Sequence, residues 1–245
     1  MIQKISYKIR PGDNLYQLSR CYQTTVQAIL AQNPNIDPYN LQIGSTIIIY
    51  PGNKYIDGLH LSACPNPNLQ IALFNQMRET WAQHVYWTRM LIISIVERLN
   101  DQNDVTNRLL KNPGDIAKIF AKYYPADTAK AIEGLLTEHL QIGAALITAV
   151  RDRDTAQADQ LNRRWYANAD KMAEAFSNIS PYYSYEELQK MLYTHLDLTT
   201  QEVVARVSGN YPADINAFDQ VEQEAMSMAD YFTSGMIRQF PQKFS

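Results

Sequence analysis

Two short stretches near the start of the chain have the hydrophobic pattern of β-strands. Ile5, Tyr7 and Ile9 alternate with polar residues, and a period of two is typical of a half-buried strand. Turn residues at positions 11–13 end this stretch. Residues 46–50, with the sequence TIIIY, are rich in β-branched side chains, which favour a second strand. We therefore expect a unit that begins and ends with a strand.

Two short helices are predicted between these strands. Asn14 is a good N-cap residue, and the first helix is expected over about Leu15–Cys21. Thr24 and Gln27 have the spacing of a capping box at the start of the second helix. Asn33 and Pro34 then end it, because the residue before a proline avoids the helical conformation. The predicted order is strand, helix, helix, strand.

A series of apolar, turn and Asn-Pro positions runs through this whole unit. Its members are Tyr7, Ile9, Gly12, Asp13, Leu15, Leu18, Tyr22, Val26, Ile29, Asn33, Pro34, Ile36, Leu41, Ile43, Gly44, Ile47, Ile49 and Pro51. With this series, residues 1–51 resemble a LysM domain. The resemblance implies an α+β fold of the βααβ type that binds the N-acetylglucosamine-containing glycans of peptidoglycan or chitin.

The resemblance also implies a shallow groove between the loop after the first strand and the loop before the last. The glycan-binding residues would be Gly12, Asp13, Asn14, Leu15, Asn33, Asn35, Ile36 and Leu41. Asn14 stands where the family more often has Thr or Ser, and it keeps the capping role. Backbone groups and small apolar side chains suffice for an acetamido sugar, so we expect binding without catalysis and without a cofactor. Such a groove binds weakly, and useful affinity requires several copies.

The composition changes after the second predicted strand. Residues 52–68 are rich in Pro, Gly and Asn and are predicted to be a linker. Residues 69–245 show apolar positions that advance by three and four, in five long stripes that begin at Phe74, Ile132, Leu161, Leu188 and Ile215. One or two short helices are expected within residues 105–124. This part is predicted to be an all-α antiparallel up-and-down helical bundle, and it is similar to uncharacterised helical proteins that accompany LysM modules in spore-forming bacteria.

Three histidines are the most specific chemical feature of the predicted bundle. His84, His139 and His195 lie on or beside the apolar stripes of three different helices, and Glu222 lies at the edge of the fifth stripe. A carboxylate among imidazoles suits zinc or iron. The alternative is that each histidine hydrogen-bonds a buried polar group and fixes the register of the bundle. We favour the second interpretation and keep a metal-binding bundle, possibly an enzyme that LysM targets, as the alternative.

Aromatic residues predict an interaction surface on the bundle. Tyr86 and the four residues 182–185 (YYSY) cannot all point inward, and exposed Tyr is typical of protein interfaces. We expect the bundle to self-assemble or to bind a protein partner. A third interpretation, a structural assembly protein in which LysM is only a packing unit, stays open.

Composition and charge exclude several classes of protein. The 245 residues are 46% hydrophobic with a net charge of −3, which suits a globular protein with no basic surface for nucleic acid. The most apolar run, residues 91–96, is far below the roughly 20 residues that span a bilayer. Because the N-terminus shows no signal peptide, we expect synthesis in the cytoplasm and action at the bacterial cell wall or spore envelope. Cys21 and Cys64 match no metal spacing and are expected to be reduced thiols, with one disulfide left open.

Overall fold

The chain divides into two compact units. The computed structural model describes residues 4–52 and 67–244, and the division falls inside a helix, between Leu73 and Phe74. The linker predicted over residues 52–68 lies for the most part outside the described residues. The N-terminal unit and the helical unit each have a hydrophobic core of their own.

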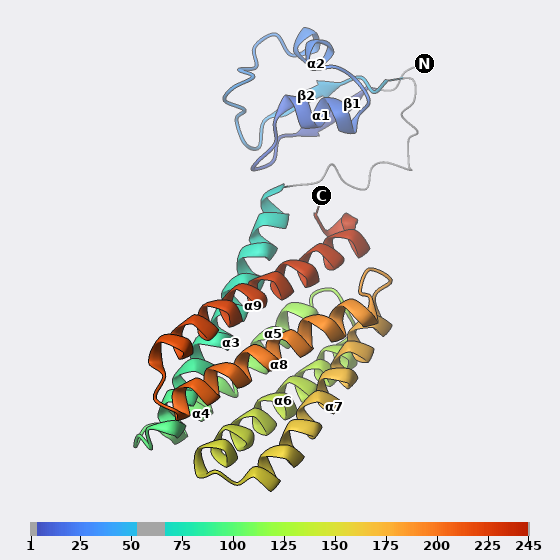
Figure 1. Ribbon diagram of the computed structural model, residues 1–245. Coiled ribbons are helices and arrows are strands. Elements are labelled where there is room, and N and C mark those ends of the chain that lie inside the picture. The colour runs from blue at the N-terminus through green and yellow to red at the C-terminus, as the bar shows by residue number, and fades with distance from the viewer. Residues whose placement is uncertain (1–3, 53–66, 245) are drawn as a thin grey trace. The chain divides into compact units, whose positions relative to one another are not determined.

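The N-terminal unit has the predicted order of elements (Figure 1). They are β1 (Ile5–Lys8), α1 (Leu15–Cys21), α2 (Val26–Gln32) and β2 (Thr46–Ile49). The two strands pair antiparallel, with Ile5 opposite Ile49 and Tyr7 opposite Ile47. The predicted alternation is confirmed, since Tyr7, Ile47 and Ile49 are all buried in one core with apolar residues of both helices.

The two short helices begin at side-chain caps. The Asn14 Oδ1 atom accepts a hydrogen bond of 2.9 Å from the Gln17 N–H, as the sequence predicts. The second cap is Thr25 and not the predicted Thr24: Thr25 has the extended backbone of an N-cap, and its Oγ1 accepts from the Ala28 N–H at 3.1 Å. Each cap satisfies one of the free backbone donors of its first turn.

The rest of the described chain is helical. Its elements are α3 (Pro67–Val96), α4 (Gln102–Leu109), α5 (Asn112–Phe120), α6 (Ala126–Asp152), α7 (Thr155–Ile179), α8 (Tyr185–Val207), α9 (Tyr211–Gln239) and a short 3₁₀ turn, Pro241–Phe244. The five apolar stripes correspond to α3, α6, α7, α8 and α9. Two short helices are found as predicted, although α4 begins at Gln102, three residues before the predicted range of 105–124. No helix within residues 4–52 and 67–244 contains a stretch long and apolar enough to cross a bilayer.

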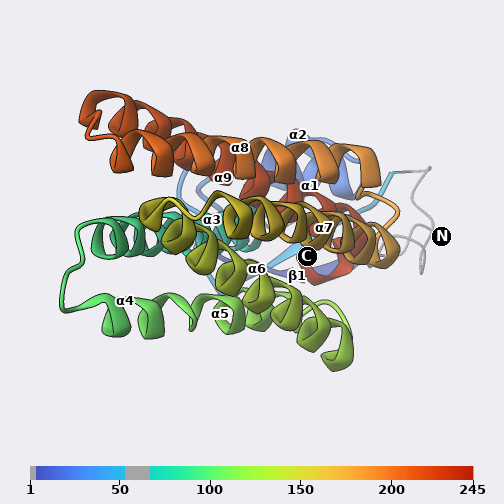
Figure 2. The same ribbon diagram turned by 60° about the horizontal axis from the view of Figure 1, so that its bottom comes forward.

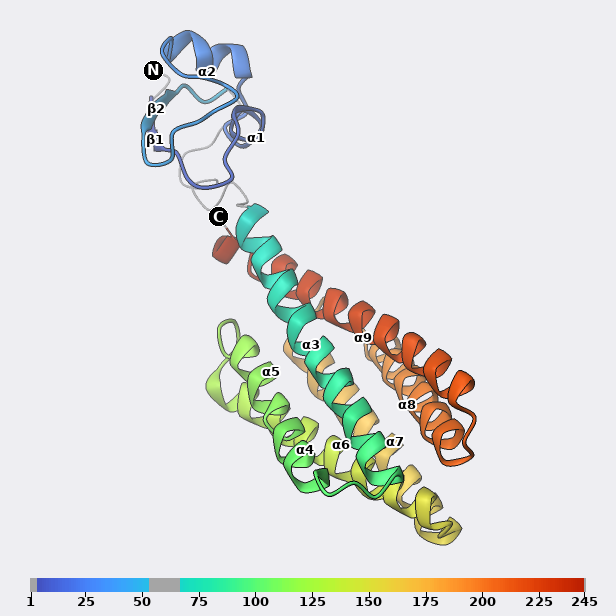
Figure 3. The same ribbon diagram turned by 90° about the vertical axis from the view of Figure 1, so that its left-hand side faces the viewer.

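These helices pack antiparallel in a bundle. Figure 2 shows α8 beside both α7 and α9, while α6 packs against α5 and α7. In Figure 3, α3 runs alongside α9, and Arg78 of α3 binds Asp230 of α9 on that side. The predicted bundle architecture is therefore confirmed.

Aromatic side chains fill one part of the bundle core. The Phe232 ring of α9 lies 4.5 Å from the Phe176 ring of α7 and 5.5 Å from the Trp81 ring of α3, measured between centroids. Phe120 of α5 joins them, 5.4 Å from Phe176. Such contacts between rings add to the stabilisation from buried area, and they join four helices in one core.

Candidate functional site

An open groove lies on the N-terminal unit, along the loop between α2 and β2. It is lined by residues 32–37, 40, 42 and 45–47 and has a volume of about 610 Å³. We call it the α2–β2 groove. It contains Asn33, Asn35 and Ile36 from the predicted glycan-binding set.

Asn33 holds this loop on the sheet. Its Nδ2 atom donates to the carbonyl oxygens of Ile29 and Ile48, at 2.7 Å each. Its Oδ1 atom accepts from the Ile48 N–H at 2.8 Å. Because these bonds use both ends of the amide, Asn33 positions the groove and leaves contact with a ligand to its neighbours.

The other predicted residues of the loop after β1 have internal roles. Gly12 has φ +86°, a conformation that side chains disfavour. Asp13 Oδ2 accepts from the Tyr7 hydroxyl at 2.9 Å and from the Arg10 N–H at 2.7 Å. Leu15 is buried in the core. These residues, Asn14 and the half-buried Leu41 do not line the α2–β2 groove, so the two-sided groove that the resemblance implies stays a prediction.

Several polar side chains in the α2–β2 groove are available to a ligand. Asn35, Asn40 and Gln42 are exposed, and none of these amides makes a side-chain hydrogen bond within the described residues. Tyr39, which precedes Asn40 in the chain and does not itself line the groove, is 98% exposed. Amide groups both donate and accept, and a Tyr ring offers an apolar face. The arrangement suits a sugar that carries hydroxyl and acetamido groups. The sequence interpretation missed Asn40 and Gln42, although the polar loop sequence contains both.

The family comparison agrees with this fold. Residues 7–49 match the sequence profile described as the LysM domain. Residues 7–49 form a LysM domain. Comparison with curated proteins and comparison with solved structures each gave no significant match. A LysM domain implies binding of peptidoglycan or a related glycan and association with the cell wall. These comparisons indicate no function for the helical unit that follows it.

Cys21 of the LysM domain is half-buried and packs against the core of that unit. Cys64 lies outside the described residues. The redox state of this pair therefore stays a prediction.

The three predicted histidines do come together in the helical unit. The His195 ring of α8 lies 5.9 Å from the His84 ring of α3 and 6.4 Å from the His139 ring of α6, between centroids. All three rings are buried. They line two internal cavities of about 30 and 20 Å³, each of which has room for one or two water molecules.

Each of two histidines is held by an asparagine side chain. Nδ1 of His84 lies 3.0 Å from Oδ1 of Asn112, and Nδ1 of His139 lies 3.2 Å from Oδ1 of Asn168. The amide oxygens fix these Nδ1 atoms as the protonated nitrogens. Desolvation lowers the pKa of His84 to about 4 and that of His139 to about 3, with further repulsion from His195. Both rings are therefore neutral at pH 7.

The carboxylate beside these rings is not the predicted one. Glu222 lies on another side of α9, where its Oε1 accepts a hydrogen bond from Tyr86 of α3. Glu224 instead lies near His195, with Oε2 at 3.2 Å from Nδ1 but without the alignment of a hydrogen bond. Within residues 4–52 and 67–244, no group of three or more His, Cys, Asp and Glu has the arrangement of a metal site. The asparagine contacts of His84 and His139 agree with histidines that hydrogen-bond buried polar groups, and the metal-binding alternative stays a prediction.

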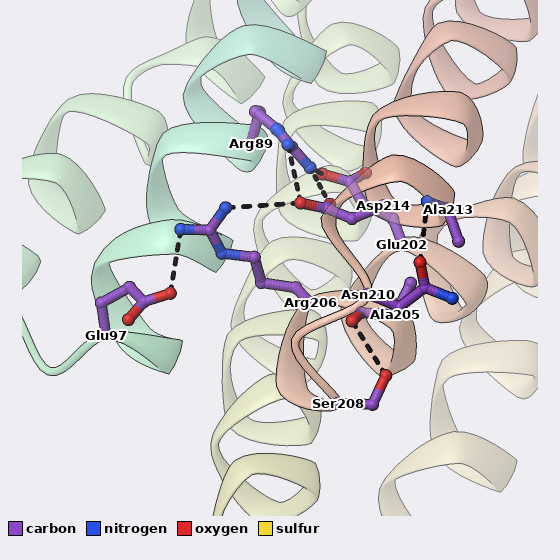
Figure 4. Close-up of polar contacts among 9 residues, drawn as sticks. All are labelled: Arg89, Glu97, Glu202, Ala205, Arg206, Ser208, Asn210, Ala213 and Asp214. Atoms are coloured by element: carbon purple, nitrogen blue, oxygen red, sulfur yellow. Dashed lines mark hydrogen bonds and ion pairs between the residues drawn. The ribbon is translucent and has the colours of Figure 1, made fainter.

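A buried ionic cluster lies farther along the same helices (Figure 4). Arg89 of α3 binds Asp214 of α9 through both terminal nitrogens, and its Nη1 lies 2.8 Å from Oε1 of Glu202 of α8. Nη1 of Arg206 lies 3.4 Å from Oδ2 of the same Asp214, and its Nη2 lies 2.9 Å from Oε1 of Glu97. Three helices are joined by these contacts, and the sequence interpretation missed the cluster.

Burial also affects the protonation of Glu202. Desolvation raises its pKa to about 7, against the opposing attraction of Arg89. Asp214 and Glu202 are almost fully buried, and a buried charge that loses its partner is strongly destabilising. The cluster therefore contributes to the alignment of α3, α8 and α9.

Proposed function

We propose that this protein is a non-enzymatic carbohydrate-binding protein. Its LysM domain would recognise N-acetylglucosamine-containing glycans of peptidoglycan, or of chitin, at the bacterial cell wall or spore envelope. The observation that carries the proposal is the LysM match of residues 7–49 on a βααβ unit. The α2–β2 groove supports it, because the side-chain amides of Asn35, Asn40 and Gln42 have no internal partner among the described residues.

The helical unit has a different role in this proposal. It would self-assemble or bind a protein partner, so that several LysM domains act together on one glycan surface. Tyr86 is 42% exposed and Tyr182 is 44% exposed, which supplies aromatic side chains of the kind found at protein interfaces. A mass measurement in solution tests self-assembly. A strict monomer contradicts it and leaves the partner-binding version.

Glycan binding is tested on the whole chain with two assays. The protein should sediment with insoluble peptidoglycan, and soluble N-acetylglucosamine oligomers should shift the amide NMR signals of residues 35–42 at millimolar concentration. Shifts of residues 12–15 as well would support the two-sided groove. If neither retention nor a shift is observed, the proposal is wrong.

A pair of matched variants makes the result specific. Asn35→Trp places a large ring in the α2–β2 groove, which should block the groove and abolish retention. The fold should be unaffected, because Asn35 is exposed and makes no side-chain hydrogen bond within the described residues. Gln27→Trp places the same ring on an exposed position of α2 that does not line the groove. It should bind like the wild type. Equal retention of both variants would move the glycan site away from this groove.

A further inference from the structure

Another pocket lies between α6, α7 and α8 of the helical unit. It has a volume of about 210 Å³. Leu146, Ile147 and Val150 of α6 and Val203 of α8 form the apolar part of its lining. Well-packed protein interiors leave few voids larger than a water molecule, so a pocket of this size has room for a small ligand.

The outer rim of the pocket is polar. Asp159 of α7 is exposed, and Asn162 of α7 and Thr200 of α8 are half-buried. None of the three side chains makes a hydrogen bond or an ion pair within the described residues. A carboxylate, an amide and a hydroxyl are thus left to bind solvent or a ligand at this rim.

The inner end of the pocket is closed by Trp165. Its Nε1 donates to the His139 carbonyl oxygen at 3.1 Å, which fixes the indole ring. Gly143 of α6 allows this position, because a Cβ there would lie 3.3 Å from the ring. The neighbouring cavity of about 20 Å³, which Trp165 also lines, has room for about one water molecule. A ligand is therefore confined to the outer pocket and contacts Trp165.

We propose that this pocket binds a small, mainly apolar molecule with one hydrogen-bonding end, of the size and class of a phenol. An apolar cavity of about 150 Å³ holds benzene, so the 210 Å³ found here accommodates one ring with a polar substituent. The apolar part of the lining takes the ring, and the rim side chains of Asn162 and Thr200 take the polar group. This pattern, an apolar lining with a few placed polar groups, is typical of small-molecule sites.

The proposal is tested by fluorine NMR on the full chain labelled with 5-fluorotryptophan. The chain has three tryptophans, and replacing each by Phe assigns its signal. Phenol should shift the Trp165 signal in a saturable way with a dissociation constant in the millimolar range or below, and leave Trp81 and Trp87 unchanged. No saturable shift at about 10 mM phenol, or shifts of all three signals together, would overturn the proposal.

Matched substitutions locate the binding site. Ala158→Leu fills the pocket from α7, and it should abolish the shift. Ala167→Leu makes the same change at an exposed position of the same helix and should preserve the shift. Val150→Phe fills the pocket from α6 and should also abolish the shift. It replaces Ala158→Leu as the test if Ala158→Leu perturbs folding. An unchanged shift in both filling variants would overturn the proposal.

The polar rim has a test of its own. Asn162→Leu should weaken phenol binding by about 5-fold, because one hydrogen bond is lost. It should leave benzene binding unchanged, since benzene makes no such bond. Equal weakening of both ligands would overturn the assignment of the polar end to this rim.

Discussion

The buried histidines predict a specific loss of stability in mild acid. His84 is 8% exposed and His139 is 3% exposed, and desolvation lowers their pKa values to about 4 and about 3. In the unfolded chain each imidazole has a pKa of about 6.5. As the pH falls below that value, the unfolded chain takes up protons that the folded helical unit does not, and the free energy of unfolding decreases.

The size of this effect follows from the two pKa values. Between about pH 6.5 and about pH 4.5, each of the two histidines lowers the free energy of unfolding by about 2 kcal/mol. The two together lower it by about 4 kcal/mol. Glu202 acts in the opposite direction, because its raised pKa of about 7 means that the folded state binds a proton before the unfolded state does. Stability from Glu202 therefore increases as the pH falls through 7, and the histidine effect must be measured as a difference.

The comparison is between the wild type and the double variant His84→Gln, His139→Gln. Urea unfolding is followed by tryptophan fluorescence at several pH values, and all tryptophans of the chain lie in the helical unit, at positions 81, 87 and 165. The wild type should lose about 4 kcal/mol more than the variant between pH 6.5 and 4.5. Parallel curves for the two proteins would refute the assignment of neutral, desolvated histidines, whatever their absolute stabilities.

Two further substitutions test the polar contacts that hold each unit. Asn33→Leu removes three hydrogen bonds, so it should destabilise the LysM domain by about 2 to 3 kcal/mol and speed hydrogen exchange of the Ile48 amide; unchanged exchange would contradict the role of Asn33. Arg89→Met removes the bidentate ion pair of the buried Asp214, and it should lower the free energy of unfolding by about 3 to 5 kcal/mol. Arg78→Met removes an exposed ion pair instead and should have little effect, so equal losses would show that burial of the cluster does not matter.

The βααβ fold could be predicted from sequence because its signals are local. The alternation of Ile5, Tyr7 and Ile9 and the cap at Asn14 act within a few residues of one another, and the bounds of α1 agree with the prediction. The wrong cap at Thr24 shows the limit of such signals. Two threonines stand side by side, and only the backbone conformation decides that the hydroxyl of Thr25 reaches the free N–H of α2.

The surroundings of the histidines could be predicted only in part. Apolar periodicity placed three imidazoles in the core, but Asn112, which binds His84, comes from a short helix whose position depends on tertiary packing. The choice between Glu222 and Glu224 is similar. Two positions along a helix differ by about 200°, and α9 packs against both α3 and α8, so each glutamate faces a different neighbour. A single apolar stripe does not distinguish these two faces.

The ionic cluster had no signal that the sequence interpretation used. Arg89, Glu202 and Asp214 are of residue types that are mostly exposed, and their pairing depends on the packing of three helices. Their position beside the histidines gives the helical unit successive layers: an aromatic core around Phe232, then the imidazoles, then the charges. A shift of one helix along another would separate buried charges from their partners, which is strongly unfavourable. These polar layers thus oppose alternative registers that an all-apolar bundle would tolerate.

The pairing of polar groups separates structural from binding residues in both units. Asn33, Asn112 and Asn168 are amides whose hydrogen bonds are made inside the protein, so their role is to position other groups. Asn35 in the α2–β2 groove and Asn162 at the phenol-sized pocket have no internal partner in the described part of the chain. Asn35 lines the groove of about 610 Å³, and Asn162 lines the pocket of about 210 Å³. Amide side chains therefore support folding at three positions, and at the other two they belong to the sites that we propose for ligands.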